Sequence, residues 1–492
     1  MGKHYAALET RFKRIHDIEG VAAILSWDAQ VIMPSGAVDE RGEQMAALSG
    51  LAHEILVDTA TGEAIEGAAG EGDLDDWARA NIREAKRRYE RARALDPKLV
   101  EAMTRAETIT EMAWREARAK SDFELLRPKL EEIVKLTAES GRQIGQALDL
   151  PVYDALLDGF QPDLRDAAIE PLFTQLRAAL PDILGEVRGR QGRPLTPVGP
   201  FPTTAQKALG RQLMETLGFD FSHGRLDESQ HPFCGGTPDD IRITTRYRED
   251  ELVSAVMGIL HETGHALYER NLPAAYRAQP VGSARGMAVH ESQSLLIEMQ
   301  ACKSPGFIAY LAPRLEAAFG QQPALTPENL RLIYRYVEPG YIRVDADEIT
   351  YPLHIVLRHR LERAMVNGDL RVADLPGAWN EGMKELLGIV PPDHARGCLQ
   401  DIHWPSGAFG YFPCYTLGAL LAAQLFTTAQ AAIPSLDDKL SAGEFGPLVG
   451  WLREKVHSQG SRLPIGCLVE QATGAPLTAD AFLSHLRGRY LN

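Results

Sequence analysis

The chain has 492 residues, of which 45% are hydrophobic and 24% are charged, and these values predict a globular protein with an ample core. Its formal net charge of −15 at pH 7 argues against nucleic acid or an anionic membrane as the main partner. The five cysteines lie far apart, as is typical of reduced thiols, and no apolar N-terminal segment resembles a secretory signal. We therefore expect a cytoplasmic protein.

Residues 1–218 alternate charged and apolar residues at helical spacing, with prolines and glycines between the runs. This pattern predicts helices over residues 4–28, 39–58, 74–94, 98–121, 126–148 and 166–191. Such helices could form a wall or a lid over a site. The chain contains no internal repeat, and we expect residues 1–492 to form a single unit.

The composition changes after Gly218, and residues 219–250 alternate β-branched and polar residues between turn dipeptides. This pattern predicts a small antiparallel β-ribbon directly before the next helix. The edge of such a ribbon could hold an extended peptide by main-chain hydrogen bonds. His231 lies in this segment, and its position is as compatible with a structural role as with substrate binding.

Residues 253–270, VSAVMGILHETGHALYER, contain a complete H-E-x-x-H motif within an apolar helical pattern. On a helix, His261 and His265 lie one turn apart on the same face, so each can direct one nitrogen at a single ion. Glu262 is adjacent and its carboxylate can reach a water molecule at that ion. The motif indicates metal-assisted hydrolysis. The alternative is a pair of histidines buried on an ordinary helix face.

Residues 287–302, MAVHESQSLLIEMQAC, have the pattern of a second helix, and turn-forming residues connect it to the first. An antiparallel arrangement of the two helices would bring Glu291 over the two histidines. Two histidines and one glutamate leave a ligand position open for water, which is the arrangement of a catalytic zinc. Alternatively, Glu291 is only a favourable acid in a first helical turn, and Glu298 is the competing ligand.

Residues 251–492 comprise the metal-binding helices and a C-terminal part that is again helical. Two polar stretches interrupt it, at residues 341–347 and 397–415. The second stretch gathers Gln400, Asp401, His403, Tyr411 and Tyr415 in a glycine-rich loop. Polar and aromatic side chains on a loop held by a helical frame are a common form of binding site.

Six motifs follow one another along the chain: His231-Pro232-Phe233, D-x-R-x-T at 240–244, HETGH at 261–265, HESQ at 290–293, I-R-x-x-A-D at 342–347 and G-x-x-Q-D-x-H-W at 397–404. In this order they resemble the carboxypeptidase Taq family of metallocarboxypeptidases. The segment SWDAQVIMPSG near the N-terminus is also similar, so the resemblance spans nearly the whole chain. It implies a mainly α-helical fold with a deep substrate groove, similar in outline to neurolysin and angiotensin-converting enzyme.

The resemblance also implies a homodimer that uses one zinc or cobalt ion per chain to remove single C-terminal residues from peptides, with broad preference. By similarity to the converting-enzyme pattern, His403 and Tyr415 are expected to face the oxyanion, with Tyr411 close by. An exopeptidase must also bind a free carboxylate, for which Arg343 is the first candidate and Arg242 the second. Either arginine could instead be a buried ion-pair partner, in the case of Arg343 with Asp345 or Asp347.

In this interpretation Glu262 takes a proton from water and later delivers it to the leaving amine. The remaining candidate substrate-binding residues are His231 and Gln400. A neurolysin-like oligopeptidase or a dipeptidase could use the same fold and metal set, unless a carboxylate-binding arginine closes the groove. A non-catalytic peptide-binding scaffold is a further alternative, although a binder has no need for the base.

Overall fold

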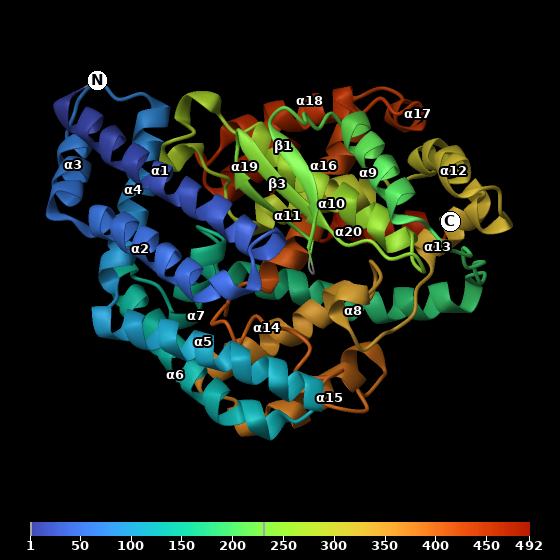
Figure 1. Ribbon diagram of the computed structural model, residues 1–492, viewed down its shortest axis with the longest axis horizontal. Helices are drawn as coiled ribbons and strands as arrows, with labels where there is room; N and C mark the ends of the chain where they lie inside the picture. Colours follow the sequence, from blue (N-terminus) through green and yellow to red (C-terminus); the bar gives the residue numbers. More distant parts are fainter. Residues whose placement is uncertain (1, 230–231) are drawn as a thin grey trace.

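The computed structural model describes residues 2–229 and 232–492. His231, one of the candidate substrate-binding residues, lies outside the described residues. The described chain is a large helical assembly with one small sheet near its centre (Figure 1). The predicted mainly α fold is therefore confirmed.

Helices α1 to α9 precede the sheet. Their bounds are α1 Lys3–Val31, α2 Val38–Val57, α3 Thr59–Ala69, α4 Asp76–Ala94, α5 Pro97–Lys120, α6 Phe123–Leu148, α7 Val152–Phe160, α8 Asp166–Arg190 and α9 Thr203–Leu217. The predicted helices match six of these within a few residues, whereas α3, α7 and α9 were not among them. Helix α3 follows α2 after a single residue, because the Asp58 side chain accepts the Ala60 N–H at 3.0 Å and starts a new helix there.

Helices α1 to α4 share a hydrophobic cluster of their own, which includes Tyr5, Phe12, Ile65 and Ile82. In Figure 1 they lie together on one side of the molecule, coloured blue. The larger hydrophobic cluster extends from α5 to the C-terminal helix. Helices α1 to α4 thus have a core of their own, whereas α5 to α9 contribute to the larger core.

The sheet contains β1 Gly224–Glu228, β2 Phe233–Thr237 and β3 Asp240–Thr245, in the order β1-β3-β2. Strands β2 and β3 are antiparallel, but β1 pairs with β3 in parallel, so the prediction of a purely antiparallel ribbon is wrong for β1. The reason is that β2 forms a tight hairpin with β3 and leaves β1 to pair with the opposite edge of β3. Ile241 and Ile243 of β3 pack against the next helix.

Helix α10, Val253–Arg270, has the predicted bounds and lies against β3. After a loop with short turns comes α11, Met287–Leu295, which continues as a π-helix over Leu296–Ala301. The predicted second helix is therefore confirmed at its start, but its last turns are wider than an α-helix. Such π segments are frequent at functional sites.

The remaining helices complete the body around α16. They are α12 Pro305–Phe319, α13 Pro327–Arg335, α14 Tyr351–Asn367, α15 Leu375–Leu387, α16 Pro413–Ala432, α17 Leu436–Ser441, α18 Gly446–Lys455, α19 Ile465–Thr473 and α20 Asp480–Tyr490. Short 3₁₀ turns cover Ser35–Ala37, Ala274–Tyr276, Pro280–Gly282, Pro323–Leu325, Arg343–Asp345, Val372–Asp374 and His457–Gln459.

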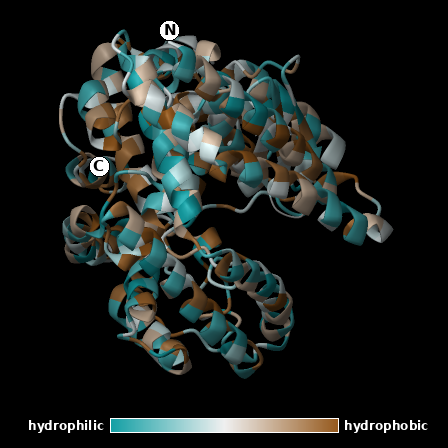
Figure 2. Ribbon diagram, turned by 90° about the vertical axis from the view of Figure 1, so that its left-hand side faces the viewer, coloured by the Kyte–Doolittle hydropathy of each residue, from teal (hydrophilic) through white to brown (hydrophobic). Residues whose placement is uncertain are grey.

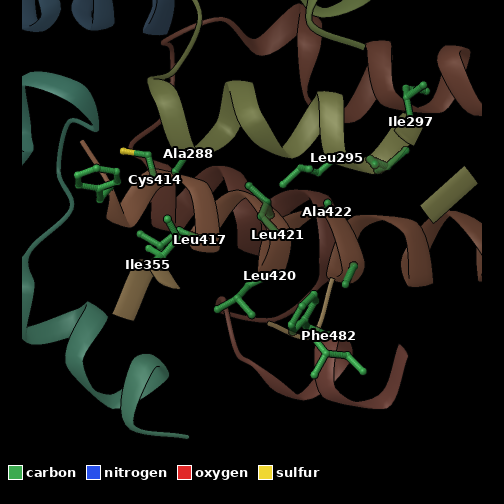
Figure 3. Close-up of a cluster of buried hydrophobic side chains, with 14 of the residues drawn as sticks. Ala288, Leu295, Ile297, Ile355, Cys414, Leu417, Leu420, Leu421, Ala422 and Phe482 are labelled. Carbon is green, nitrogen blue, oxygen red and sulfur yellow. The ribbon is translucent and has the colours of Figure 1, made fainter. Parts of the chain in front are cut away.

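Most helices carry hydrophilic and hydrophobic residues side by side, as Figure 2 shows, which is the pattern of amphipathic helices packed on a core. Helix α11 is among the more deeply placed ones and rests on α16, where Leu417, Leu421 and Ala422 lie beneath Ala288 and Leu295 (Figure 3). Among the described residues, no helix has both the length and the apolar character needed to cross a membrane.

Candidate functional site

His261 and His265 on α10 and Glu291 on α11 direct their side chains toward one point. The Nε2 atoms of His261 and His265 lie 4.0 Å and 3.5 Å from Oε2 of Glu291. Ligands about 2.0–2.1 Å from a tetrahedral ion lie about 3.3 Å apart, so a small inward movement would let these three atoms share one ion. Glu291 lies one turn into α11 and is not a first-turn acid, which argues against the alternative that it only stabilises the helix end.

The second ring nitrogen of His261 is held by Glu298. The distance from His261 Nδ1 to Glu298 Oε2 is 3.0 Å, and Lys303 pairs with the other oxygen of Glu298 at 3.0 Å. Burial opposes the ionisation of Glu298, but the charge of Lys303 and the bond to His261 outweigh it and lower its pKa to about 2. Glu298 therefore orients a candidate ligand, as outer partners in metal sites do, and is not placed as a competing ligand.

The second ring nitrogen of His265 is held in a similar way. His265 Nδ1 lies 2.6 Å from His290 Nδ1, and His290 Nε2 lies 2.8 Å from Glu269 Oε1. Both metal-binding candidates on α10 thus have one nitrogen engaged by the protein and Nε2 facing Glu291. A donor set of two imidazoles, each fixed by an outer partner, and one carboxylate fits a divalent metal ion.

Glu262 lies beside this group and is 8% exposed. Burial raises the pKa of its carboxyl to about 7, against the opposing influence of His261. A carboxylate whose pKa lies near neutrality is well matched to accept a proton and return it at that pH.

A cleft of about 1420 Å³ runs along α10 past these residues. Gly20 and Ala23 of α1 line one wall and Cys234 of β2 another, and Tyr351 and Tyr415 lie on the C-terminal side. Strand β2 is one of the two edge strands of its sheet and borders the cleft. All three predicted segments of the chain therefore contribute to one cleft.

Three tyrosines on the C-terminal side, Tyr351, Tyr411 and Tyr415, present their side chains to this cleft. Burial raises the pKa of Tyr351 to about 12 and raises the pKa values of Tyr411 and Tyr415 further, with an added contribution from the Glu291 charge. Their hydroxyls remain protonated near neutral pH and can donate hydrogen bonds into the cleft.

His403 does not line the cleft but lies behind Tyr415, with its Nε2 3.1 Å from the tyrosine hydroxyl. Burial lowers the pKa of His403 to about 4, so the ring is neutral near pH 7. The structure therefore separates the two predicted oxyanion residues, since Tyr415 faces the cleft and His403 is placed to orient it.

Arg343 lines the cleft and is 6% exposed. Its Nε and Nη2 donate to Oδ1 of Asp401 at 3.0 and 2.8 Å, and Nη1 donates to the Tyr351 hydroxyl at 2.8 Å. Arg358 binds the other Asp401 oxygen at 2.6 Å. Two guanidinium groups thus share one carboxylate, so these three side chains together carry a formal charge of +1. The ion-pair partner is Asp401 and not an aspartate of residues 345–347.

Arg242, the second candidate for the substrate carboxylate, lies elsewhere. It forms two bonds to Asp240, at 2.6 and 2.7 Å, and its guanidinium lies 4.4 Å from the centre of the Trp27 ring. Arg242 is not among the residues that line the cleft. It joins β3 to α1, so it is the ion-pair partner that the sequence left as the alternative.

Gln400 is buried and binds only main chain. Its Nε2 donates to the carbonyls of Tyr341, Arg396 and Gly397, and its Oε1 accepts the Arg343 N–H at 2.8 Å. With donors and acceptor occupied, this side chain is not placed to bind substrate, which corrects its predicted role. It fixes the backbone of Arg343 instead.

The sequence did not identify Tyr351 and Asp401 as the hydrogen-bond partners of Arg343. It also did not identify Glu298 and His290 as the partners of His261 and His265. Asp401 and His290 stand inside recognised motifs, which was the available signal. Tyr351 follows the I-R-x-x-A-D motif by four residues, and no spacing rule links it to Arg343.

A second group of possible metal ligands, Asp166, Glu170 and His359, differs in its surroundings. Arg363 Nη1 donates to both carboxylates at 2.8 Å, and His359 binds Asp166 at 2.7 Å. Since a guanidinium already occupies the space between the acids, this group is an ion-pair network.

Known proteins match the chain along its length. A family model described as carboxypeptidase Taq (M32) metallopeptidase matches residues 7–490. Thermostable carboxypeptidase 1 of Thermus thermophilus is 39% identical over 486 residues, which cover 96% of this chain and 95% of that protein. Carboxypeptidase 1 of Bacillus subtilis is 35% identical over 489 residues, which cover 98% of this chain and 96% of that protein.

Solved structures match as closely. Metallocarboxypeptidase 1 of Trypanosoma cruzi has a TM-score of 0.97 at 39% identity, with 100% of both chains covered. A structure of Pyrococcus furiosus carboxypeptidase has a TM-score of 0.96 at 33% identity and covers 100% of this chain and 99% of its own.

Proposed function

The chain belongs to the carboxypeptidase Taq (M32) family of metallopeptidases and is a metal-dependent carboxypeptidase, and we propose that it removes single C-terminal residues from peptides with broad preference. The observation that carries this proposal is one cleft that brings together the metal-binding triad, Glu262 and Arg343 with its surplus positive charge. An oligopeptidase, a dipeptidase and a silent scaffold are not favoured, since the relatives named above are carboxypeptidases.

The metal-binding residues in this proposal are His261, His265 and Glu291, and the ion is zinc, with cobalt as the alternative. Two imidazole nitrogens and one carboxylate suit zinc and leave a position open. When bound there, the ion polarises the scissile carbonyl and lowers the pKa of a water molecule.

Glu262 is the proton carrier. It accepts a proton from the attacking water and delivers it to the nitrogen of the leaving amine. The hydroxyls of Tyr415 and Tyr411 donate hydrogen bonds to the oxygen on which negative charge develops. His403 holds Tyr415 in position from behind.

Arg343 binds the free carboxylate of the substrate. A carboxylate beside Arg343, Arg358 and Asp401 would neutralise the surplus charge of that group, which a peptide bond in mid-chain cannot do. The edge of β2 would hold the extended peptide through main-chain hydrogen bonds. The carboxylate thereby fixes which peptide bond reaches Glu262.

We further propose a cytoplasmic homodimer in which residues 1–492 form one catalytic unit. Residues 1–218 are the helical wall or lid, 219–250 the β-ribbon and 251–492 the metal-binding and C-terminal part. The free cysteines support the location, and the shared cleft supports the single unit. The dimer rests on the family resemblance, and sedimentation of the purified protein would test it.

The proposed reaction is tested by mass spectrometry of the products from an unblocked peptide and from its C-terminal amide, with and without chelator. The free acid should give a ladder of products that each lack one more C-terminal residue, and the amide should remain largely intact. Chelator should stop the reaction, and zinc or cobalt should restore it. Cleavage inside the amidated peptide, or release of dipeptides, would contradict the proposal.

A further inference from the structure

Helix α11 carries Glu291, yet its own sequence supplies no side chain to cap its first turn. Gly286 precedes the helix with φ of 114°, a conformation that favours glycine. The first N–H groups of any helix have no partner within it and need acceptors from elsewhere, above all when they are buried. The start of α11 therefore depends on a distant residue.

That residue is Gln161, which directly follows α7. Its Oε1 accepts the N–H groups of Ala288 at 2.9 Å and Val289 at 3.4 Å, and its Nε2 donates to the carbonyl of Arg285 at 2.9 Å. Gln161 is fully buried, and a Cβ at Gly286 would lie 2.7 Å from its Oε1. One side-chain amide thus joins the segment before α11 to the first turn of the helix.

The same segment is held from two other directions. The Arg285 N–H donates to the hydroxyl of Tyr268 on α10 at 3.0 Å, one turn beyond His265. The buried Arg285 guanidinium pairs with Glu84 of α4 at 3.1 Å and with Asp163. The metal-binding helices and the N-terminal wall therefore meet at this one junction.

On its other face, α11 lies closely on α16 (Figure 3). A Cβ at Gly418 of α16 would lie only 2.8 Å from the Cβ and Cγ of Glu291. Contact with α16 limits sideways movement of α11, while the bonds to Gln161 fix where the helix begins along its axis. A slip by one residue would move Glu291 by about 1.5 Å, whereas metal–ligand distances tolerate only about 0.2 Å.

We propose that Gln161 is a positioning residue for the metal ligand Glu291. Its amide sets the start of α11 and thereby the distance between Glu291 and the two histidines of α10. This inference rests on the proposed metal site and adds to it a residue of the N-terminal wall, far away in the sequence, on which metal affinity depends.

The test compares Gln161→Met with Gln424→Met in the full-length protein. Methionine keeps the volume of glutamine but removes every hydrogen bond. Gln424 is a matched control because it is also buried and its amide also ties a helix to a neighbouring loop, through the carbonyls of Ala475 and Pro476 and the N–H of Thr478. It lies near the middle of α16, six residues beyond Gly418, and its side-chain amide bonds to residues 473–478 and not to α11.

Two readouts are needed: the affinity of the apoprotein for zinc and cobalt, by competition with a chromophoric chelator, and the melting temperature without metal. Both variants should melt at a lower temperature than the parent. Only Gln161→Met should also bind metal about 10–100-fold more weakly and change the visible absorption bands of bound cobalt, since the loss of an outer support typically has that effect.

Parent-like metal affinity in Gln161→Met, or an equal loss in both variants, would overturn the inference. If Gln161→Met does not fold, Gln161→Asn decides, because it keeps an amide but withdraws it by one methylene from the N–H groups of Ala288 and Val289. It should bind metal about 10–100-fold more weakly, and unchanged affinity would refute the inference. A parent that binds no metal, or loses none on Glu291→Gln, would instead refute the proposed ligand set itself.

Discussion

At the scale of single residues, substitution can separate proton transfer by Glu262 from metal binding by His261, His265 and Glu291. Glu262→Gln keeps the size of the side chain but removes the group that accepts the proton. Turnover should fall by ~10³ or more while metal content by elemental analysis stays near one ion per chain. Turnover equal to the parent's would remove Glu262 from the mechanism.

The roles of Glu291 and Glu298 can be separated in the same way, because the carboxylates of both lie within 4.0 Å of a ring nitrogen of His261. Glu291→Gln should release the metal, since a ligand is lost. Glu298→Gln should weaken metal affinity by only about 10–100-fold, since it loosens the orientation of His261 without removing a ligand. Chelator competition measures both, and the reverse order of effects would show that Glu298 is the ligand.

His261, Glu262 and His265 could be predicted because the chemistry of H-E-x-x-H fixes a spacing on one helix, whereas Glu291 depended on the expected antiparallel packing of the next helix. Asp401 and Arg343 are 58 residues apart, and only the fold shows that they pair. Gln400 and Arg242 stand in motifs of the same kind, yet one binds backbone and the other binds Asp240. A motif identifies residues that matter without stating whether each one faces the cleft or supports it.

At the scale of elements, the bounds of α10 followed from an apolar helical pattern bounded by polar residues. The parallel pairing of β1 with β3 could not be predicted, because the sequence pattern does not show which strands are neighbours in the sheet. The π-helix after α11 has no signal in the sequence pattern either. It places Glu298 against His261, and the C-terminal helix α20 supports it from outside.

Arg489 of α20 provides that support. It donates to the carbonyl of Met299 at 2.5 Å and to Glu348 at 3.1 Å, and Glu348 is buried. Arg489→Met should lower the free energy of unfolding by about 2–3 kcal/mol, because a buried carboxylate and a freed carbonyl lose a charged partner. Urea unfolding measures this change. Arg487→Met on the exposed face of the same helix is the control and should change little.

At the scale of the whole molecule, buried neutral histidines make stability depend on pH. Burial and the charge of Arg358 lower the pKa of His354 to about 3, from an ordinary value near 6.5. Between these values the unfolded chain binds a proton that the folded chain does not. The stability that neutral His354 permits is therefore complete above about pH 6.5 and declines as the pH falls toward 3.

His354→Gln should remove this contribution. Between pH 6 and 4, the free energy of unfolding of the parent should fall more steeply than that of the variant, by about 1.4 kcal/mol per pH unit. Urea unfolding at a series of pH values measures both slopes. Loss of metal at low pH would lower the stability of both proteins equally, so it does not affect the difference between the slopes. Identical slopes would mean that His354 is protonated in the folded protein.

The cleft itself belongs to this scale, since α1, β2 and the C-terminal helices each form part of it. The central claim is that Arg343 in this cleft recognises the substrate's free carboxylate and so makes the protein an exopeptidase. Arg343→Ala should weaken transition-state binding of free-acid peptides by about 2–4 kcal/mol and that of C-terminal amides much less. Arg242→Ala is the matched control, since it removes an arginine that also pairs with an aspartate but lies outside the cleft.

The most direct measurement is the ratio of kcat/KM for a free-acid peptide to kcat/KM for its amide, in the parent, Arg343→Ala and Arg242→Ala proteins. We predict that the ratio collapses in Arg343→Ala and remains at the parent's value in Arg242→Ala. Equal losses for both substrates in Arg343→Ala would show that this residue supports the fold and does not recognise the carboxylate, which would contradict the account.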